Sequence, residues 1–522
     1  MGLKQRLTAV GIIAIAAVVT FGIARSGRQI TQQQEETIFS GGKETLYLWY
    51  TDEALTPYLS GAAVTYNENH DIRVVPVLES GLEYLEKINA SSLESNAPDL
   101  YILSHDSLEK AYLAGLAGEV APPENFSMEN TYIDTGIKAA TYKDKVIAYP
   151  FYFETSSFLY NRTYLEDMAR KGLEAEADAL EGELAQSQAD EAAASGTIGA
   201  VAEEIDTMGS ENTVDLGAAA ADNEAESRFT PEQIEERMRE ILPATIDDIR
   251  EFADNYDAPE QVEGVFKWDV TDIFYNYFFV GGAINMGGEA GWDTDRIDIY
   301  NLDAIHNMRS YQELNQFFSI DTNEITYDTV LDEFMAGKMV FTTATTDAVE
   351  RLEQAKEEGL FPYEYDIAPL PGIDENHGSR SLSMTSCVVV NGYSERKEAA
   401  NDFAAFVTSE YNDILYARAG KVSAAKDVDY DYAALDRFAQ EYEKSVPMPK
   451  MLETSNFWVK LEVLFSQVWN GADANEKLKS LSEEMKTQVI GEPCEEEYLE
   501  EPEEAEEEDG GEESENGDSA EE

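Results

Sequence analysis

Few residues in this 522-residue sequence have the type and spacing that catalysis or metal binding requires. The two cysteines, Cys387 and Cys494, lie far apart in the chain, so we expect neither a disulfide framework nor a cysteine-based metal site. Cys387 falls in an apolar run and is predicted to be a small buried side chain. No pair of histidines has metal-ligand spacing, so we expect no metal and no cofactor; the four are His70, His105, His306 and His377.

Carboxylates are the remaining groups that could react. Asp106 and Glu154 could in principle form the acid/base pair of a glycosidase. The sequence contains no nucleophile elbow, no P-loop and no metal triad to support such a reading. We therefore predict that the protein is not an enzyme.

The charge balance restricts the partners. The chain has 37 basic and 105 acidic residues, a formal net charge of −68. Such a surface repels phosphate backbones and anionic lipid headgroups, so we expect no nucleic-acid partner. Solubility in an exposed compartment is the simplest explanation of the acidity.

The N-terminus has the layout of an export signal. Lys4 and Arg6 precede an uncharged run from Leu7 to Ala24, which Arg25 and Arg28 follow. The run of about 18 residues is long for a cleaved signal and just long enough to span a bilayer. Residues 1–28 are predicted to be a signal peptide or an uncleaved signal anchor, and residues 29–43 a linker.

Strand and helix patterns alternate through the body of the chain. Strands are expected at 45–50, 72–77 and 98–103, with helix patterns between them, which favours an α/β lobe with a largely parallel sheet. Further along, 272–275 and 339–343 look like strands and 327–335 like a helix.

Two acidic segments differ from this body. Residues 171–228 are rich in Ala, Glu, Asp, Gly and Ser and nearly free of aromatic residues, which indicates a disordered or loosely helical insertion. Order is expected to resume at Thr230, where a capping box with Pro231 and Gln233 begins a helix. Residues 492–522 contain no lysine or arginine and are predicted to be a disordered acidic tail.

A series of short segments, in order along the chain, resembles the bacterial extracellular solute-binding proteins of family 1, the maltose/maltodextrin-binding type. Each segment alone is a weak signal, but the full ordered set is specific. The segments are 46–49 (LYLW), 97–100 (APDL), 104–106 (SHD), 114–116 (AGL), 142–150 (YKDKVIAYP), 334–339 (FMAGKM), 368–372 (APLPG) and 455–458 (SNFW).

The resemblance implies an α/β, two-lobed periplasmic-binding-protein type II fold, with a hinge cleft that closes on the ligand. It implies an N-lobe from 44–153 and 386–433, and a C-lobe from 154–385 and 434–491. The acidic insertion then belongs to the C-lobe.

The resemblance also assigns ligand-binding residues. It places hydroxyl-binding carboxylates at Asp106 and Glu154 and a sugar-stacking ring at Trp458, and carboxylates and aromatic rings suit vicinal hydroxyls and an apolar sugar face. For Thr51, Asp52 and Glu53, the polar residues after the first strand, helix capping is as good an explanation as ligand binding. The remaining candidates, at polar positions of the family's site, are Thr51, Asp52, Glu53, Asp269 and Asp347.

The sequence departs from the maltose-binding pattern at three positions. Leu103 stands where maltose binders carry a tryptophan, Ser107 replaces a basic residue, and Asp347 replaces a second stacking tryptophan. The altered stacking surface puts maltose itself in doubt, and the lack of a retained arginine argues against an anionic solute. A maltodextrin or another oligosaccharide is the expected ligand.

We therefore expect the substrate-binding subunit of an ABC importer, a monomer that delivers a sugar to a membrane permease. It would act on the outer face of the cytoplasmic membrane, or as a secreted or periplasmic protein. Two alternatives from other classes stay open: a sensor that presents the sugar to a membrane receptor, and a scaffold whose acidic tail captures cations or cell wall.

Overall fold

The structure is a computed structural model that describes residues 44–92, 94, 97–194, 228–318, 320–322 and 324–500. The chain divides into two compact units. Unit 1 contains the described residues up to Phe153 together with Met384–Asp431, and unit 2 contains Glu154–Ser383 and the residues from Tyr432 onward. The chain therefore passes between the units three times.

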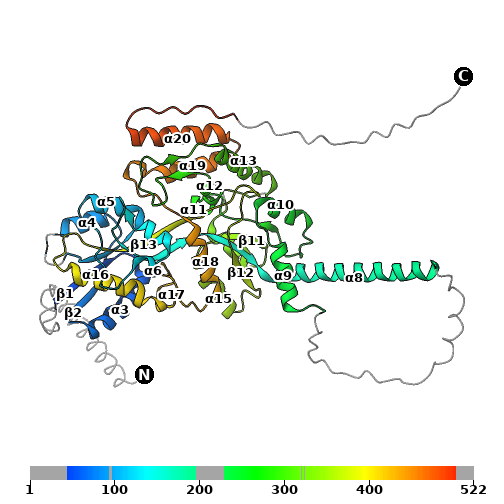
Figure 1. Ribbon diagram of the computed structural model, residues 1–522, viewed down its shortest axis with the longest axis horizontal. Helices are drawn as coiled ribbons and strands as arrows, with labels where there is room; N and C mark the ends of the chain where they lie inside the picture. The colour runs from blue at the N-terminus through cyan, green and yellow to red at the C-terminus, as the bar shows by residue number, and fades with distance from the viewer. Residues whose placement is uncertain are drawn as a thin grey trace, which may run out of the picture. The chain divides into compact units, whose positions relative to one another are not determined.

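Unit 1 is built on a mixed sheet between two layers of helices (Figure 1). Its strands are β1 Glu44–Tyr50, β2 Ile72–Leu78, β3 Leu100–Ser104, β4 Thr141–Tyr142, β5 Lys145–Val146, β6 Tyr149–Thr155, β13 Leu382–Val390 and β14 Val422–Ser423. Its helices are α3 Thr56–Asn69, α4 Tyr84–Ser91, α5 Leu108–Leu113, α6 Met128–Thr131, α7 Asp134–Ala139, α16 Lys397–Ala405 and α17 Leu415–Ala419.

The strand order β14-β6-β13-β3-β1-β2 places β1 at the centre of a parallel trio. Strands β1, β2 and β3 are parallel and β13 runs antiparallel to β3, so the expected largely parallel sheet holds only for the first three strands. Leu48 of β1 pairs with Pro76 of β2 and with Leu100 of β3. Alternate residues of β1 point to one face, where Leu46 and Leu48 pack with side chains of α3 and α16 in one apolar core. The expected strands at the start of the chain are confirmed.

Unit 2 contains a four-stranded sheet of order β12-β7-β11-β8 with several helices around it (Figure 1). Its strands are β7 Ser157–Asn161, β8 Gly264–Phe266, β9 Asn285–Met286, β10 Ile297–Asp298, β11 Met339–Ala344, β12 Tyr365–Ala368 and β15 Val446–Pro447. Its helices are α8 Arg162–Ala194, α9 Pro231–Ile241, α10 Ile246–Asn255, α11 Ile273–Asn276, α12 Phe278–Gly281, α13 Leu302–Phe317, α14 Tyr327–Met335, α15 Asp347–Glu357, α18 Ala433–Lys444, α19 Phe457–Trp469 and α20 Ala474–Ile490.

Helix α14 shows how the local sequence fixes an element of this unit. Thr326 caps its first turn in a capping box with Thr329. Gly337 follows its last turn with a φ of +73°, and a Cβ added there would lie 2.3 Å from the Tyr363 hydroxyl. A residue with a side chain could not end the helix in this way. The helix predicted at 327–335 and the strand predicted at 339–343 are both present, which confirms these predictions.

The predicted strand at 272–275 is wrong, because Ile273–Asn276 form the short helix α11. The β-branched and aromatic residues there favour a strand by propensity, but the Asp272 carboxylate accepts a hydrogen bond from the Phe274 amide at 2.8 Å. That N-cap begins a helical turn, and Ile273 and Tyr275 are buried by tertiary packing.

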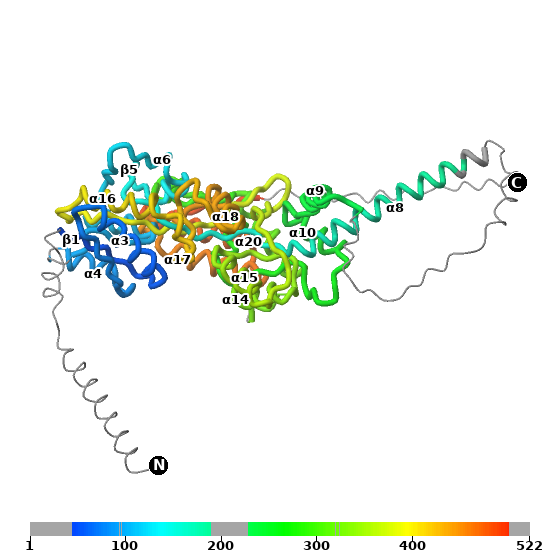
Figure 2. The backbone as a smooth tube through the Cα atoms, turned by 90° about the horizontal axis from the view of Figure 1, so that it is seen from below, coloured from blue at the N-terminus to red at the C-terminus, as the bar shows by residue number. Residues whose placement is uncertain are grey.

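The segment 171–228, predicted to be disordered or loosely helical, is helical in its first part. Helix α8 continues to Ala194 and projects from unit 2 as a long rod beside α9 (Figure 2). Ala, Glu and Leu are strong helix formers, and Arg237 of α9 pairs with Glu176 of α8 at 2.8 Å. The predicted capping box at Thr230 is confirmed at the start of α9. Residues 195–227 of the predicted insertion lie outside the described residues.

The predicted tail also begins with ordered chain. The Leu499 amide donates a hydrogen bond to the Tyr300 hydroxyl at 2.8 Å, and the Asn475 side chain donates to the Leu499 carbonyl at 2.9 Å. The Cys494 amide donates to Thr487 Oγ1 at 3.0 Å. Residues 492–500 therefore pack back on α20, and the remainder of the tail lies outside the described residues.

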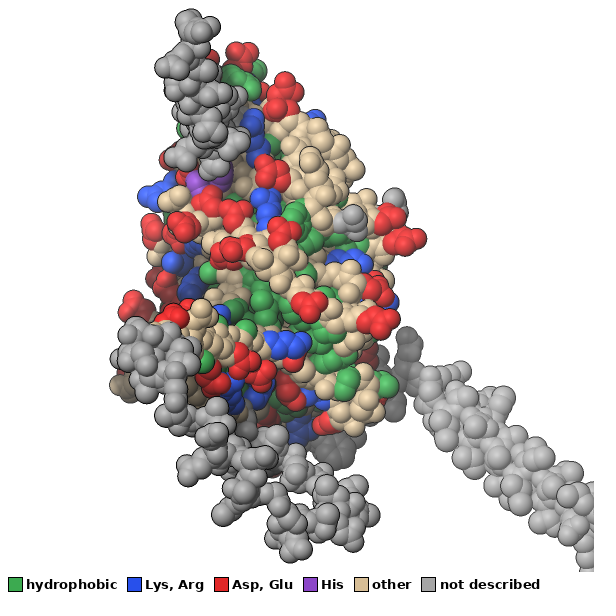
Figure 3. All heavy atoms as spheres, turned by 90° about the vertical axis from the view of Figure 1, so that its right-hand side faces the viewer, with side chains coloured by type: hydrophobic (Ala, Val, Ile, Leu, Met, Phe, Trp, Pro, Cys, Tyr) green, Lys and Arg blue, Asp and Glu red, His purple; other side chains and the backbone are tan. Residues whose placement is uncertain are grey.

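The predicted signal segment and linker, residues 1–43, also lie outside the described residues. Within the part of the chain that the structure describes, no helix is both long and apolar enough to cross a membrane. Acidic side chains are spread over the face shown in Figure 3, with lysines and arginines among them. The acidity of the sequence is therefore also present on the folded surface.

Candidate functional site

In unit 1, the predicted ligand-binding residues follow two neighbouring strands. Strands β1 and β3 are parallel and paired, and they end at Tyr50 and Ser104. Thr51, Asp52 and Glu53 come directly after β1, and Asp106 comes directly after β3. The carboxyl ends of adjacent parallel strands lie on one edge of a sheet, which is where open α/β sheets bind their ligands.

Asp106 lies in a single 3-10 turn, His105–Ser107, that is anchored to the sheet. The buried His105 accepts a hydrogen bond at Nδ1 from the Thr385 amide of β13, with a distance of 2.9 Å. The Asp106 side chain is partly exposed, but its Oδ1 atom is buried and accepts no hydrogen bond. A buried carboxylate oxygen without a donor is uncommon and costly, and this oxygen is free to accept a further hydrogen bond.

The residues after β1 have different environments. Asp52 caps the turn that follows, since its Oδ1 accepts from the Ala54 amide at 3.0 Å. Its Oδ2 pairs with Lys421 Nζ at 3.1 Å, and that ammonium also lies over the Tyr152 ring. Thr51 and Glu53 are exposed at the same strand end. Capping accounts for Asp52, while Thr51 and Glu53 remain accessible to a ligand.

In unit 2, Glu154 and Asp347 are linked through Thr346. Glu154 is in β6, and Asp347 is the first residue of α15, directly after strand β11. The Thr346 hydroxyl is buried and donates a hydrogen bond to Glu154 Oε1. Glu154 is therefore in contact with the residue that directly precedes Asp347 in the chain.

Asp347 accepts a hydrogen bond from Tyr327, a residue that the sequence did not point to. The Tyr327 hydroxyl donates to Asp347 Oδ1 at 3.0 Å, and the Thr345 hydroxyl donates to the same oxygen. Burial, with the Asp347 charge next, raises the pKa of Tyr327 well above its ordinary value, so this hydroxyl stays a donor. The Tyr275 ring stacks on Tyr327 with a centroid separation of 4.9 Å.

Asp269 is buried and both of its oxygens bind protein groups. Oδ1 accepts from the Thr271 amide and hydroxyl at 2.9 and 2.6 Å, and Oδ2 accepts from the Tyr327 amide at 2.9 Å. Asp269 therefore fixes the start of α14 and, through it, the Tyr327 side chain. Its neighbour Trp268 is fully buried and donates to Asn276, so it belongs to the core.

Trp458 lies in the first turn of α19 and is partly exposed. Its ring packs against Tyr277, with centroids 5.6 Å apart and planes inclined by 58°. Tyr277 is fully buried and its hydroxyl has no hydrogen-bond partner. One face of Trp458 is therefore supported by the core of unit 2, which keeps the ring in a fixed orientation.

The departures from the maltose-binding pattern also have clear positions. Leu103 pairs with Cys387 in the sheet of unit 1, and both side chains are buried, which confirms the prediction for Cys387. Ser107 is half-buried beside Asp106. Asp347, in place of a tryptophan, accepts from Tyr327, on which the buried Tyr275 ring stacks. Tyr275 lies in a segment rich in aromatic residues and Tyr327 does not, and only the fold shows that they meet.

The predicted ligand-binding residues thus form two groups, one in each unit. Unit 1 brings Thr51, Asp52, Glu53 and Asp106 to one edge of its sheet. Unit 2 joins Glu154, Asp347 and Asp269 through Thr346 and Tyr327, and carries Trp458 on α19. Carboxylate oxygens, hydroxyls and aromatic rings of this kind suit a polar, uncharged ligand with an apolar face.

The comparisons with known proteins identify the family of the chain. Residues 61–432 match the family model described as bacterial extracellular solute-binding protein. This match spans well over half of the sequence, and the chain therefore belongs to the bacterial extracellular solute-binding proteins. No curated protein matches the sequence significantly.

Solved structures of similar fold include several two-lobed sugar-binding proteins. An extracellular solute-binding protein from Staphylococcus aureus in complex with maltose has a TM-score of 0.63 at 17% identity, over 86% of this chain and 98% of that one. A cyclo/maltodextrin-binding protein with maltotetraose has a TM-score of 0.61 at 19% identity, over 86% and 98%. The maltose-binding periplasmic protein of Listeria monocytogenes has a TM-score of 0.60 at 16% identity, over 87% and 100%. The predicted α/β fold of this class is confirmed.

Proposed function

We propose that the protein is the substrate-binding subunit of a sugar importer of the ABC type, and that it captures a maltodextrin or another uncharged oligosaccharide. The observation that carries the proposal is the buried Asp106 Oδ1 atom, which lies at the carboxyl edge of the unit 1 sheet and lacks a hydrogen-bond donor. A sugar hydroxyl would supply that donor, in a charge-assisted bond.

The second group of residues supports a sugar in particular. Trp458 offers a partly exposed ring supported from behind by Tyr277, which suits the apolar face of a pyranose. Glu154 and Asp347 add carboxylates that can accept pairs of hydroxyl hydrogens. The similar structures that contain maltose or maltotetraose favour an α-glucan among uncharged sugars.

Capture would follow from the division of these residues between the units. Asp106 belongs to unit 1 and Trp458 to unit 2, so a sugar that bound both residues would link the two units. Ligand binding would then favour a closed state by adding contacts that the open state lacks. The closed form would present the sugar to a membrane permease.

The proposal includes a location outside the cytoplasmic membrane. The apolar run from Leu7 to Ala24 between basic residues has the layout of a signal or signal anchor. The protein would act as a monomer, either anchored by this segment or as a periplasmic or secreted form. Binding without catalysis is the expected activity, since Asp106 and Glu154 are assigned here to hydroxyl recognition.

A thermal-shift screen of the full chain against a panel of sugars tests this function. A ligand at about 100 times its dissociation constant should stabilise the folded protein by about 2.7 kcal/mol. Malto-oligosaccharides should raise the melting temperature, while sugar acids and sugar phosphates should not. Stabilisation by an anionic solute alone, or turnover of a sugar in the same sample, would contradict the proposal.

A further inference from the structure

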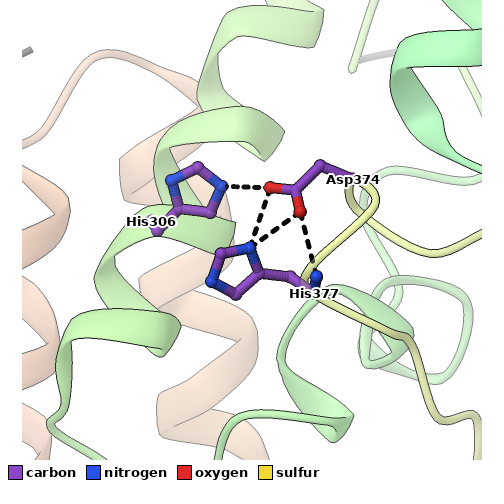
Figure 4. A group of neighbouring side chains, drawn as sticks. All are labelled: His306, Asp374 and His377. Atoms are coloured by element: carbon purple, nitrogen blue, oxygen red, sulfur yellow. Dashed lines mark hydrogen bonds and ion pairs between the residues drawn. The ribbon is translucent and has the colours of Figure 1, made fainter. Parts of the chain in front are cut away.

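Two histidines that the sequence keeps 71 positions apart meet in unit 2, together with an aspartate. His306 lies on α13, and Asp374 and His377 lie on the loop between β12 and β13 (Figure 4). One ligand atom from each of the three residues lies within 4.8 Å of the other two. The three side chains point toward one another, and none of them belongs to the candidate sugar site.

The loop backbone anchors one oxygen of the Asp374 carboxylate, His377 Nδ1 lies within hydrogen-bond distance of both oxygens, and His306 Nε2 lies close to the second. Its Oδ1 atom accepts from the backbone amides of Asn376 and His377 at 2.7 and 2.9 Å. Its Oδ2 atom lies 2.6 Å from His306 Nε2 and 2.8 Å from His377 Nδ1. The Ile373 amide closes the loop on the His377 carbonyl at 2.7 Å. The loop backbone therefore holds the carboxylate in place before any ion binds.

The second nitrogen of His377 also has an acidic neighbour. Its Nε2 atom lies 3.7 Å from Asp303 Oδ1, on the same helix as His306. Without a metal ion, the nearer Asp374 carboxylate favours a proton on Nδ1; an ion bound at Nδ1 would replace that proton, and Asp303 could then accept a hydrogen bond from Nε2–H. Histidines that bind metals commonly have such a partner.

We propose that His306 Nε2, His377 Nδ1 and Asp374 Oδ2 bind one divalent transition-metal ion of the zinc type, with water completing the coordination. Zinc binds imidazole nitrogen at about 2.0–2.1 Å and carboxylate oxygen at about 2.0–2.2 Å, which separates two tetrahedral donors by about 3.4 Å. Each nitrogen therefore needs to move less than 1 Å further from the carboxylate oxygen than its present 2.6 or 2.8 Å, and the two nitrogens already lie within 4.8 Å of each other. The half-exposed His306 ring can make this movement.

The donor set also distinguishes this site from the acidic surface around it. Two imidazoles and one carboxylate suit zinc, nickel or copper, whereas calcium and magnesium prefer oxygen ligands alone. The acidic face and the glutamate-rich segments can attract any cation weakly. Selective binding of Zn²⁺ in excess Mg²⁺ and Ca²⁺ would therefore report the histidine cluster.

A bound ion would join α13 to the loop that leads into β13, within unit 2 alone. The expected effect is a more stable unit 2 at saturating metal, because the ion would bind the folded arrangement and not the separated residues. This inference does not depend on the proposed sugar function, and its test uses no sugar.

The test is an isothermal titration of the full chain with ZnCl₂ in excess Mg²⁺ and Ca²⁺. We expect one site of micromolar or tighter affinity, and a loss of at least tenfold in affinity for His306→Gln and for His377→Gln. His70→Gln, a substitution of a partly exposed histidine in unit 1, is the matched control and should leave the affinity unchanged. Melting curves without metal verify that each variant is folded.

A second readout separates a true site from weak surface binding. Zn²⁺ should raise the melting temperature of the parent protein, a chelator should reverse the rise, and the double variant His306→Gln/His377→Gln should show no rise. The proposal is overturned if the double variant binds Zn²⁺ as tightly as the parent, or if the parent binds only at millimolar concentration.

Discussion

The Thr346 hydroxyl donates a hydrogen bond to Glu154 Oε1 across 192 positions of sequence. The bond joins strand β6, where the chain enters unit 2, to the start of α15. Thr346 is fully buried, so the bond holds Glu154 in one orientation. In the proposed function this bond prepares Glu154 to accept a sugar hydroxyl before the ligand arrives.

Replacing Thr346 by valine keeps the shape and removes the donor. We expect Thr346→Val to weaken oligosaccharide binding about tenfold, because a hydrogen bond to a charged group contributes about 1.5–3 kcal/mol. Calorimetric titration measures the change, with Thr65→Val on α3 as the control. In a Glu154→Gln background, Thr346→Val should cause a smaller loss of affinity than it causes in the parent protein, since the two residues act through one bond. Fully additive losses would show that Thr346 does not act through Glu154.

Asp106 should matter for affinity and not for folding. We expect Asp106→Ala to lower oligosaccharide affinity by about 1.5–3 kcal/mol, the range for a hydrogen bond to a charged group. The free energy of unfolding of the free protein should stay the same or rise, because the substitution removes a buried oxygen without a donor. Urea unfolding and calorimetry of one sample test both, with the exposed Asp71→Ala as control. A destabilised variant of unchanged affinity would assign Asp106 a structural role.

Trp458 is expected to stack on the sugar. Trp458→Ala should weaken binding by about 1–3 kcal/mol, the scale of a lost aromatic platform, while Trp458→Phe should lose less. Trp292→Ala, a change at another partly buried tryptophan of unit 2, is the matched control. Equal affinities for parent and Trp458→Ala would remove this residue from the site.

Glu496, in the ordered start of the tail, is expected to make the stability of unit 2 depend on pH. Burial opposes the ionisation of Glu496, but hydrogen bonds from Lys486 and Ser482 outweigh it and hold the pKa of Glu496 below its ordinary value. A lowered pKa in the folded state means that Glu496 stabilises the fold above the ordinary carboxyl range. This contribution is lost as the pH falls through the lowered pKa.

We therefore expect Glu496→Gln to destabilise the protein by up to about 1 kcal/mol at pH 7, and to cost progressively less as the solution is acidified. Urea unfolding at a series of pH values measures the difference, with the exposed neighbour in Glu497→Gln as control. A cost that does not change with pH would show that the Glu496 charge has no part in docking residues 492–500.

Local sequence signals predicted the elements that are fixed by neighbouring residues. The capping box at Thr230 and helix Tyr327–Met335 each have a start signal within one turn, and β1 is a compact run of β-branched and aromatic residues. These features need no tertiary information. The family resemblance then supplied the order of the segments and the positions of Asp106 and Trp458.

Features that depend on contacts between distant segments could not be predicted from the sequence. The short helix α11 overrides the strand propensity of its residues because Asp272 caps it and unit 2 buries it. The bond between Tyr327 and Asp347 joins two helices, and the meeting of His306 with His377 requires a loop closed by backbone hydrogen bonds. Acidic composition suggested disorder at 492–500, where specific hydrogen bonds to Tyr300 and Asn475 order the chain.

The central claim is that one sugar binds residues of both units and brings the units together. Small-angle X-ray scattering of residues 44–500 without 195–227, with and without the best sugar from the screen, tests it most directly. The account predicts that the radius of gyration falls on saturation for the parent protein, and falls less for Trp458→Ala at the same sugar concentration. A radius of gyration that stays constant while calorimetry shows full occupancy would contradict capture by closure.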